Sequence, residues 1–423
     1  MAERTRRGAG LLTDLRPLRH SADYRRVWTG QTISNIGAQM TIVATGYQVY
    51  RLTESSFAVG LIGLSSLLPL VAGGLYGGAL VDAYDRRTVA LWSAMGLWIC
   101  SIAFFVQALL GNESVGLLYG LVAVQSAMFA VNNPARGAML PRLLPPELLP
   151  AANALGMAAF TLGFSVGALG GGAVIAWHGV EAAYGVDVLT FTASLYALVR
   201  LPAMPPPSGA PSVPGLRSVV DGLTFLRRAP NVRATFVVDI VAMVLAQPRA
   251  LMPALALSVF ASSASTLGLL QAAPALGSFA AFLVSGWVSG VRRQGLAVLV
   301  AVAVYGAAVA VAGFAATGAA GLLWLCVGCI AVSGGADMVS AAFRSTILQT
   351  AAPDELRGRM QGIFTLVVAG GPRLGDFLIG ALAAGMGEGG AMVVGGSLCV
   401  LVVGVLAWRQ PGFRAYDARE PTP

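Results

Sequence analysis

Five ionisable side chains lie within long apolar stretches of this sequence; they are Asp239, Arg249, Asp337, Arg373 and Asp376. A charge near the middle of a bilayer costs at least a few kcal/mol, so such groups usually face a cavity and have a function. A buried carboxylate can bind and release a proton during a conformational cycle, because burial favours its neutral form and a nearby arginine favours its charged form. In a transporter driven by a proton gradient, Asp239, Asp337 and Asp376, together with Arg373, are therefore the candidates for proton coupling.

The surroundings of these acids differ in the sequence. Arg373 and Asp376 are three residues apart on one predicted helix, so we expect them to form a permanent ion pair. Asp239 has no arginine within one helical turn and is the first candidate for a proton carrier. Asp187 lies near the end of an apolar stretch, where we expect it at the membrane interface.

A polar stripe is predicted on the first apolar helix. Gln31, Asn35 and Gln39 recur every four residues, which places them on one helix face. Such a stripe should face water or substrate, although hydrogen bonds between helices, worth about 0.6 kcal/mol each in membranes, are the alternative. The residues predicted to line a substrate cavity are Gln31, Asn35, Gln39, Gln125, Arg249 and Asp337. Aromatic rings at Trp28, Tyr47, Trp92 and Trp98 are candidates for stacking on a flat substrate, and are also typical of membrane interfaces.

The composition indicates a membrane protein that is helical throughout. Apolar residues make up 56% of the chain and charged residues 11%, whereas soluble domains have about 25% charged residues. A membrane helix needs about 20 apolar residues, and the chain has room for twelve. We predict spans at 27–50, 57–81, 89–110, 115–135, 151–177, 184–201, 235–256, 265–289, 296–316, 321–343, 359–386 and 391–408.

An internal repeat divides these spans into two halves. Arg136 and Glu147 recur as Arg344 and Glu355, in both cases 208 residues later. Two homologous bundles of six helices are therefore predicted, an arrangement in which transporters bind substrate between the repeats. The predicted segments are a cytoplasmic N-terminal segment (1–26), a first bundle (27–201), a linker with an interfacial helix (202–234), a second bundle (235–408) and a cytoplasmic tail (409–423).

The basic residues predict the orientation of the chain in the membrane. All 27 are arginines, and nearly all fall in alternate loops, which predicts that both termini are cytoplasmic. The N-terminus lacks the pattern of a cleaved signal peptide. No aromatic residues are interleaved with the arginine clusters, so the net charge of +8 does not indicate binding to nucleic acid. The absence of lysine favours a bacterial source, which predicts the bacterial cytoplasmic membrane.

The loop after the second predicted span resembles the signature loop of the major facilitator superfamily. It contains Gly78 and Asp82 followed by Arg86 and Arg87. The resemblance implies a cytoplasmic gate formed by these four residues together with Arg136, in which Asp82 pairs with the arginines. The alternative is that these charged residues are exposed to water and only set the orientation of the helices in the membrane.

The match to this superfamily has departures. Ala83 replaces a basic residue, Asp85 often corresponds to glycine, and the second copy has Gly290 in place of the acid. Gly167 stands where antiporters of the superfamily often have proline, and plain close packing of glycines explains that segment equally well.

A narrower resemblance covers nearly the whole chain. The strings NNPARGAMLPRLLPPELLPAANAL (132–155) and TAAPDELRGRMQGIF (350–364) resemble bacterial exporters of the enterobactin type and, more loosely, macrolide and multidrug efflux relatives. The resemblance implies export of a siderophore or a drug-like natural product by alternating access, coupled to protons, by a monomer in the lipid bilayer. Multidrug or macrolide efflux is the alternative substrate class.

Other classes of protein are not favoured by the sequence. A non-transporting membrane sensor remains the alternative from a different class, and a membrane-embedded enzyme would need a polar catalytic cluster that the sequence lacks. Cys326 and Cys329 have redox spacing but lie in a lipid-like stretch without a second pair or a nearby histidine, so we expect buried thiols and neither a metal nor a cofactor.

Overall fold

The computed structural model describes residues 14–205, 224–317, 322–351, 354–417 and 419, and it omits the side chains at 75, 78, 79, 82, 289 and 354–366. These residues form long helices, and within the described ranges the only β pairing is an isolated bridge between Arg293 and Asp417. The helices of the first half are α1 (Arg16–His20), α2 (Ala22–Thr53), α3 (Ser56–Ala83), α4 (Arg86–Leu109), α5 (Val115–Leu143), η1 (Pro146–Leu148) and α6 (Leu149–Val199). Those of the second half are α8 (Pro230–Leu245), η2 (Arg249–Leu251), α9 (Met252–Ala254), η3 (Leu255–Val259), α10 (Ala264–Leu283), η4 (Ser285–Gly290), α11 (Gln294–Thr317), α12 (Leu323–Ala351), α13 (Asp354–Arg409) and α14 (Pro411–Arg414).

Nine helices within the described part of the chain are long and apolar enough to cross a membrane. This agrees with an all-α membrane protein that crosses the bilayer many times. α2 is not among the nine, because its polar stripe and its arginines lower its hydropathy. Several helices extend beyond their predicted spans; α5, for example, continues to Leu143 rather than ending at 135.

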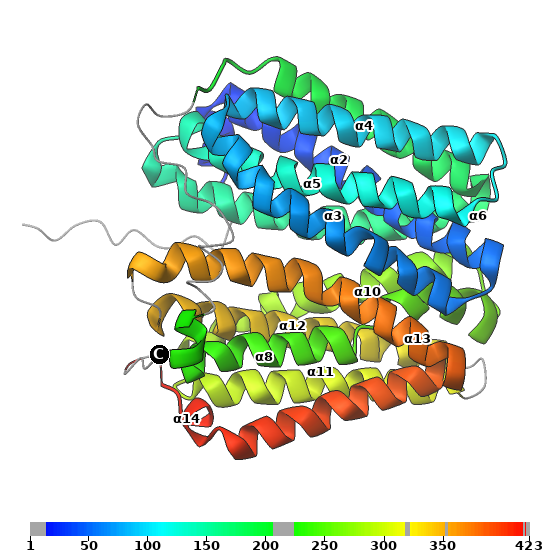
Figure 1. Cartoon of the computed structure of the whole chain (residues 1–423), viewed down its shortest axis with the longest axis vertical. Coiled ribbons are helices and arrows are strands. Elements are labelled where there is room, and N and C mark those ends of the chain that lie inside the picture. Colours follow the sequence, from blue (N-terminus) through cyan, green and yellow to red (C-terminus); the bar gives the residue numbers. More distant parts are fainter. Residues whose placement is uncertain (1–13, 206–223, 318–321, 352–353, 418, 420–423) are drawn as a thin grey trace, which may run out of the picture.

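The helix boundaries repeat between the two halves. α4 and α11 begin at Arg86 and Gln294, and α5 and α12 begin at Val115 and Leu323, with a shift of 208 residues each time. Figure 1 shows the helices of the first half on one side of the molecule and those of the second half on the other. The repeat seen in the sequence is therefore also present in the lengths of the helices.

Two glycines, also 208 residues apart, reverse the chain direction within α6 and α13. Gly179 has φ 83° and ψ 175°, and Gly387 has φ 74° and ψ 168°, a conformation that is essentially confined to glycine. Figure 1 shows α13 crossing the molecule in orange and returning in red. We call the end of the molecule that carries these two reversals the far end, and the opposite end, where α14 lies, the terminal end.

The counterpart of α2 in the second half is interrupted. The predicted span over 235–256 falls within the candidate membrane span Pro230–Val259, but the helix is not continuous, because α8 ends at Leu245 and the chain becomes helical again only at Arg249. Pro248 explains the break, since proline lacks an N–H and keeps the preceding residue out of the helical conformation. The hydroxyl of Tyr305 donates to the carbonyl of Ala246 and to Oε1 of Gln247, both at 3.3 Å, and so satisfies acceptors at the break.

The two halves contact each other closely at the far end. The hydroxyls of Tyr50 and Ser258 are 2.7 Å apart, and Ser56 donates to Oε1 of Glu388 at 2.9 Å. α3 packs on α13 and α6 packs on α10 through glycines, which allow the backbones to approach. The space between the halves is therefore closed at the far end.

Candidate functional site

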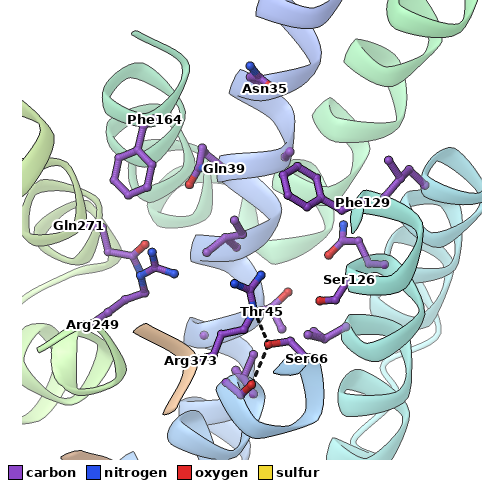
Figure 2. Close-up of a pocket in the computed structure, with 18 of the residues that line it drawn as sticks. Asn35, Gln39, Thr45, Ser66, Ser126, Phe129, Phe164, Arg249, Gln271 and Arg373 are labelled. Atoms are coloured by element: carbon purple, nitrogen blue, oxygen red, sulfur yellow. Dashed lines mark hydrogen bonds between the residues drawn. The ribbon is translucent and has the colours of Figure 1, made fainter. Parts of the chain in front are cut away.

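A cavity of about 340 Å³ lies between the two halves. The polar stripe of α2 forms part of its wall, as Gln31, Asn35 and Gln39 all line it. Gln125 of α5 and Arg249 of the second half line it as well. Figure 2 shows Arg249 on one side of the cavity, Phe129 on the opposite side, and Arg373 between them.

A second cavity of about 280 Å³ adjoins the first. The two cavities share Phe160, Phe164, Arg249 and Gln271, and the second one adds Asp337. The structure thus brings all six residues of the predicted substrate site to the walls of one pair of adjoining cavities.

The aromatic wall differs from the one considered for the sequence. Four phenylalanines line the first cavity; they are Phe129, Phe160, Phe164 and Phe191. Trp28, Tyr47, Trp92 and Trp98 line neither cavity, and Trp92 is 66% exposed on the outer surface. Exposed tryptophans are typical of membrane interfaces, so the aromatic surface of the cavity comes from the phenylalanines.

The expected ion pair between Arg373 and Asp376 is absent. Nε of Arg373 donates to Oγ of Ser66 on α3 at 2.8 Å, and Nη1 donates to the carbonyl of Ala369 at 2.5 Å. Helical side chains lean toward the N-terminus of their helix, and this direction takes the guanidinium away from Asp376. No ion pair joins the two residues, both of which are described.

Asp376, on α13, instead lies against η2, the helical piece that begins at Arg249 after the break. The positive charges of Arg249 and Arg373 and the backbone N–H of Ala250 all act on its carboxylate. Asp376 is only 7% exposed, yet it lines the first cavity. The cavity therefore contains a carboxylate placed between two arginines but locked to neither.

Asp239 is paired with an arginine from a distant helix. Nη1 of Arg344 on α12 contacts Oδ1 of Asp239, and both side chains are 4% exposed. Nη2 of the same arginine contacts Oδ1 of Asp337 at 3.3 Å, and the Asp337 side chain is 41% exposed. The pairing of Asp239 therefore comes from another helix, and within this triad only Asp337 lines either of the two cavities; the role of Asp239 as a proton carrier stays a prediction.

The repeat places a different set of residues at the same positions of the first half. The counterparts of Asp239, Asp337 and Arg344 are Gln31, Phe129 and Arg136.

Arg136 consequently has neutral partners. It donates to Oδ1 of Asn132 and to Oγ of Ser194, both at 2.7 Å, while it lines the first cavity. Arg136 thus adds a cation to the wall that Arg249 and Arg373 already make positive.

The structure describes the side chains of only some of the residues in the predicted gate. Positions 78 and 82 lie outside the described side chains, so the pairing of Asp82 with arginines stays a prediction. Arg86 donates to the carbonyl of Ala138 at 3.0 Å, and Nη2 of Arg87 donates to that of Val199 at 2.7 Å. Both carbonyls lie near helix C-termini, where a cation is favourable.

Asp85, next to this predicted gate, caps α4. Its Oδ1 accepts from the N–H of Thr88 at 2.8 Å, and its Oδ2 accepts from the N–H of Met204. Partial burial acts to raise the pKa of Asp85, but these hydrogen bonds outweigh it and hold the pKa below its ordinary value. The segment that follows α6 is thereby fixed to the start of α4.

Asp187 is more deeply packed among helices than its place near the end of a predicted span indicated. It is fully buried between helices, and its Oδ2 accepts hydrogen bonds from Thr41 at 2.8 Å and from Ser101 at 2.7 Å; its depth in the membrane stays a prediction. Thr41 and Ser101, hydroxyl residues in two apolar stretches, were the only hint of such a site in the sequence. The packing of α2 and α4 on α6 shows that both contact Asp187.

Comparisons of the sequence with known proteins find a family of membrane transporters and two exporters of high coverage. The family described as transmembrane secretion effector matches residues 12–422. The enterobactin exporter EntS of Citrobacter koseri is 31% identical over 412 residues, which cover 95% of this chain and 96% of the relative. The enterobactin exporter EntS of Shigella boydii is 31% identical over 93% of both chains.

Solved transporters share the fold. The nucleoside transporter NupG aligns with a TM-score of 0.71 at 13% identity, over 91% of this chain and 99% of that one. A bacterial homologue of the iron transporter ferroportin, in an inward-facing state, aligns with a TM-score of 0.70 at 15% identity, over 93% and 99%.

Proposed function

Because the chain belongs to the transmembrane secretion effector family of the major facilitator superfamily, we propose that it exports a small anionic molecule of the siderophore kind. The proposal includes twelve membrane spans in two six-helix bundles, a monomer, and both termini in the cytoplasm of a bacterium. The substrate would enter the cavity from the terminal end and leave when the halves rock to open the far end.

The charge of the cavity wall is the observation that carries this substrate class. Arg136, Arg249 and Arg373 line the first cavity, and Asp376 is the only acid among the described residues that line it. Arginine binds oxyanions through charge-assisted hydrogen bonds, which are the strong ones. The four phenylalanines offer faces for flat rings, so an aromatic oxyanion such as a catecholate fits both features.

Proton coupling is proposed at the acids of the second half. Asp239 and Asp337 share one arginine, so the triad is one positive charge short when both acids are ionised. A proton on Asp337, which faces the second cavity, relieves this excess. Asp376 is the further candidate, because its two neighbouring arginines are also the ones that a substrate anion would approach.

Transport in inside-out membrane vesicles tests the proposal. Vesicles that contain the protein should accumulate a catecholate when a proton gradient is imposed, and accumulation should stop when an ionophore removes the gradient. A panel that also includes a macrolide separates siderophore export from drug efflux. The absence of gradient-driven accumulation of any compound, with the protein present in the membrane, would contradict export and favour a membrane sensor.

Arg249→Met should weaken binding of an anionic catecholate by about 10- to 100-fold, since a hydrogen bond to a charged group contributes about 1.5–3 kcal/mol. Binding can be measured by calorimetry on the purified protein. Arg233→Met is the matched control, because Arg233 is exposed on α8 and lines neither cavity. Equal affinities of the two variants would remove Arg249 from the site.

A further inference from the structure

Asp187 occupies a buried position in the first half that the proposed transport site does not use. It lies on the returning part of α6, after the reversal at Gly179, and its exposed fraction is 0%. Thr41 of α2 and Ser101 of α4 each donate a hydroxyl hydrogen bond to its Oδ2. Its Oδ1 is buried without a hydrogen-bond partner.

No cation within the described chain neutralises this carboxyl group. The groups that act on it from the helices packed around it are the hydroxyls of Thr41 and Ser101, and no charged side chain contributes. In the second half, the buried acids Asp239 and Asp376 and the partly exposed acid Asp337 all lie beside arginines.

An ionised carboxylate in this position would be unfavourable. Removal of an ion from water costs several kcal/mol, and that cost is offset only by a partner charge and well-formed hydrogen bonds. Two hydroxyl donors on one oxygen leave the other oxygen unsatisfied, and a proton on that second oxygen removes the charge. The surroundings therefore favour the neutral acid with the proton on Oδ1.

Asp187 also lies directly behind the wall of the first cavity. Phe191, one turn after Asp187, lines the cavity, and so does Leu97, one turn before Ser101. On α2, Thr45 lines the cavity and donates to the carbonyl of Thr41 at 2.8 Å. A displacement of α2 at the cavity wall would therefore change the contact between Thr41 and Asp187.

The packing of α2 on α6 leaves little tolerance at this point. Gly37 faces Asp187, and a β-carbon added there would lie 2.8 Å from Oδ1. The close approach is what excludes water from the carboxyl group in this conformation. A separation of α2 from α6 would admit water to Oδ1 and favour the ionised form.

We propose that Asp187 is a proton-binding site, neutral in this conformation and ionised when α2 moves relative to α4 and α6. It is a site of the first half, separate from the acids of the second half. The neutrality of Asp187 stands on the packing alone, whereas its use as a coupling proton rests on the proposed export function.

Infrared difference spectroscopy on the full-length protein in lipid nanodiscs tests the neutrality. A protonated carboxyl stretching band should be present at neutral pH and absent in Asp187→Asn. The band should shift in Thr41→Val and in Ser101→Ala, because each variant removes one hydrogen bond to the same oxygen. An unchanged protonated band in Asp187→Asn, or the loss of an ionised carboxylate band instead, would overturn the proposal.

Transport in proteoliposomes tests the use of this proton. Gradient-driven uptake of a catecholate should fall by about 10- to 100-fold in Asp187→Asn, while exchange of the same compound without a gradient should persist. Loss of both activities would show that Asp187 supports the structure rather than the coupling. A wild-type protein that transports nothing would contradict export, and the infrared result would still decide whether Asp187 is neutral.

Discussion

Replacement of Arg344 with methionine should lower the free energy of unfolding by about 3–5 kcal/mol, because it leaves two acids without their shared cation. Arg344 contacts both Asp239 and Asp337 and is 4% exposed. Thermal unfolding of the detergent-solubilised protein, compared with the wild type, measures the loss.

The repeat supplies the control for this variant. Arg136→Met changes the corresponding residue of the first half, whose partners Asn132 and Ser194 are neutral, so the loss should be only about 1–3 kcal/mol. The double variant Arg344→Met with Asp239→Asn should recover part of the loss, since it removes one of the stranded acids. Equal losses for Arg344→Met and Arg136→Met would contradict the triad.

Gly268→Leu should prevent the far end from closing and reduce export by about 100-fold or more, which is the effect of a shift of about 3 kcal/mol in a two-state equilibrium. A β-carbon at position 268 would lie 3.0 Å from Cα of Gly172 on α6, and one at 172 would lie 2.7 Å from Cα of Gly268. Backbone atoms cannot yield as a flexible side chain can, so α6 and α10 must separate.

Spin-label distances can detect this separation. Labels at Arg51 and Ser262, which are exposed on opposite halves near the far end, should move apart in Gly268→Leu. Gly120→Leu is the matched control, because position 120 is exposed on α5 and has no neighbouring atom within 4 Å of an added β-carbon. An unchanged distance in Gly268→Leu would show that the contact does not hold the far end closed.

Features that recur along one helix could be predicted from the sequence. The spacing of Gln31, Asn35 and Gln39 fixed their common face without any knowledge of neighbouring helices, and the structure places them together on the cavity wall. The helix boundaries of the two halves likewise follow the repeat. These predictions depend on the helical period and on residue counts alone.

Features that depend on two distant helices could not be predicted in this way. Arg344 is far from Asp239 in the sequence, so nothing local indicated their pairing. The burial of Asp187 depends on the packing of α2 and α4 against α6. The break before Arg249 did have a local signal in Pro248, but the apolar run around it also fitted a continuous span.

The unequal form of α2 and its counterpart α8 has a mechanical consequence. α2 is one unbroken rod of 32 residues, whereas the matching stretch of the second half has a joint at Ala246–Pro248 beside Arg249. When the halves move, we expect α2 to tilt as a whole and its counterpart in the second half to bend at the break. We therefore expect the duplicated halves to contribute unequally to motion, with flexure concentrated where a ligand's charge would be held.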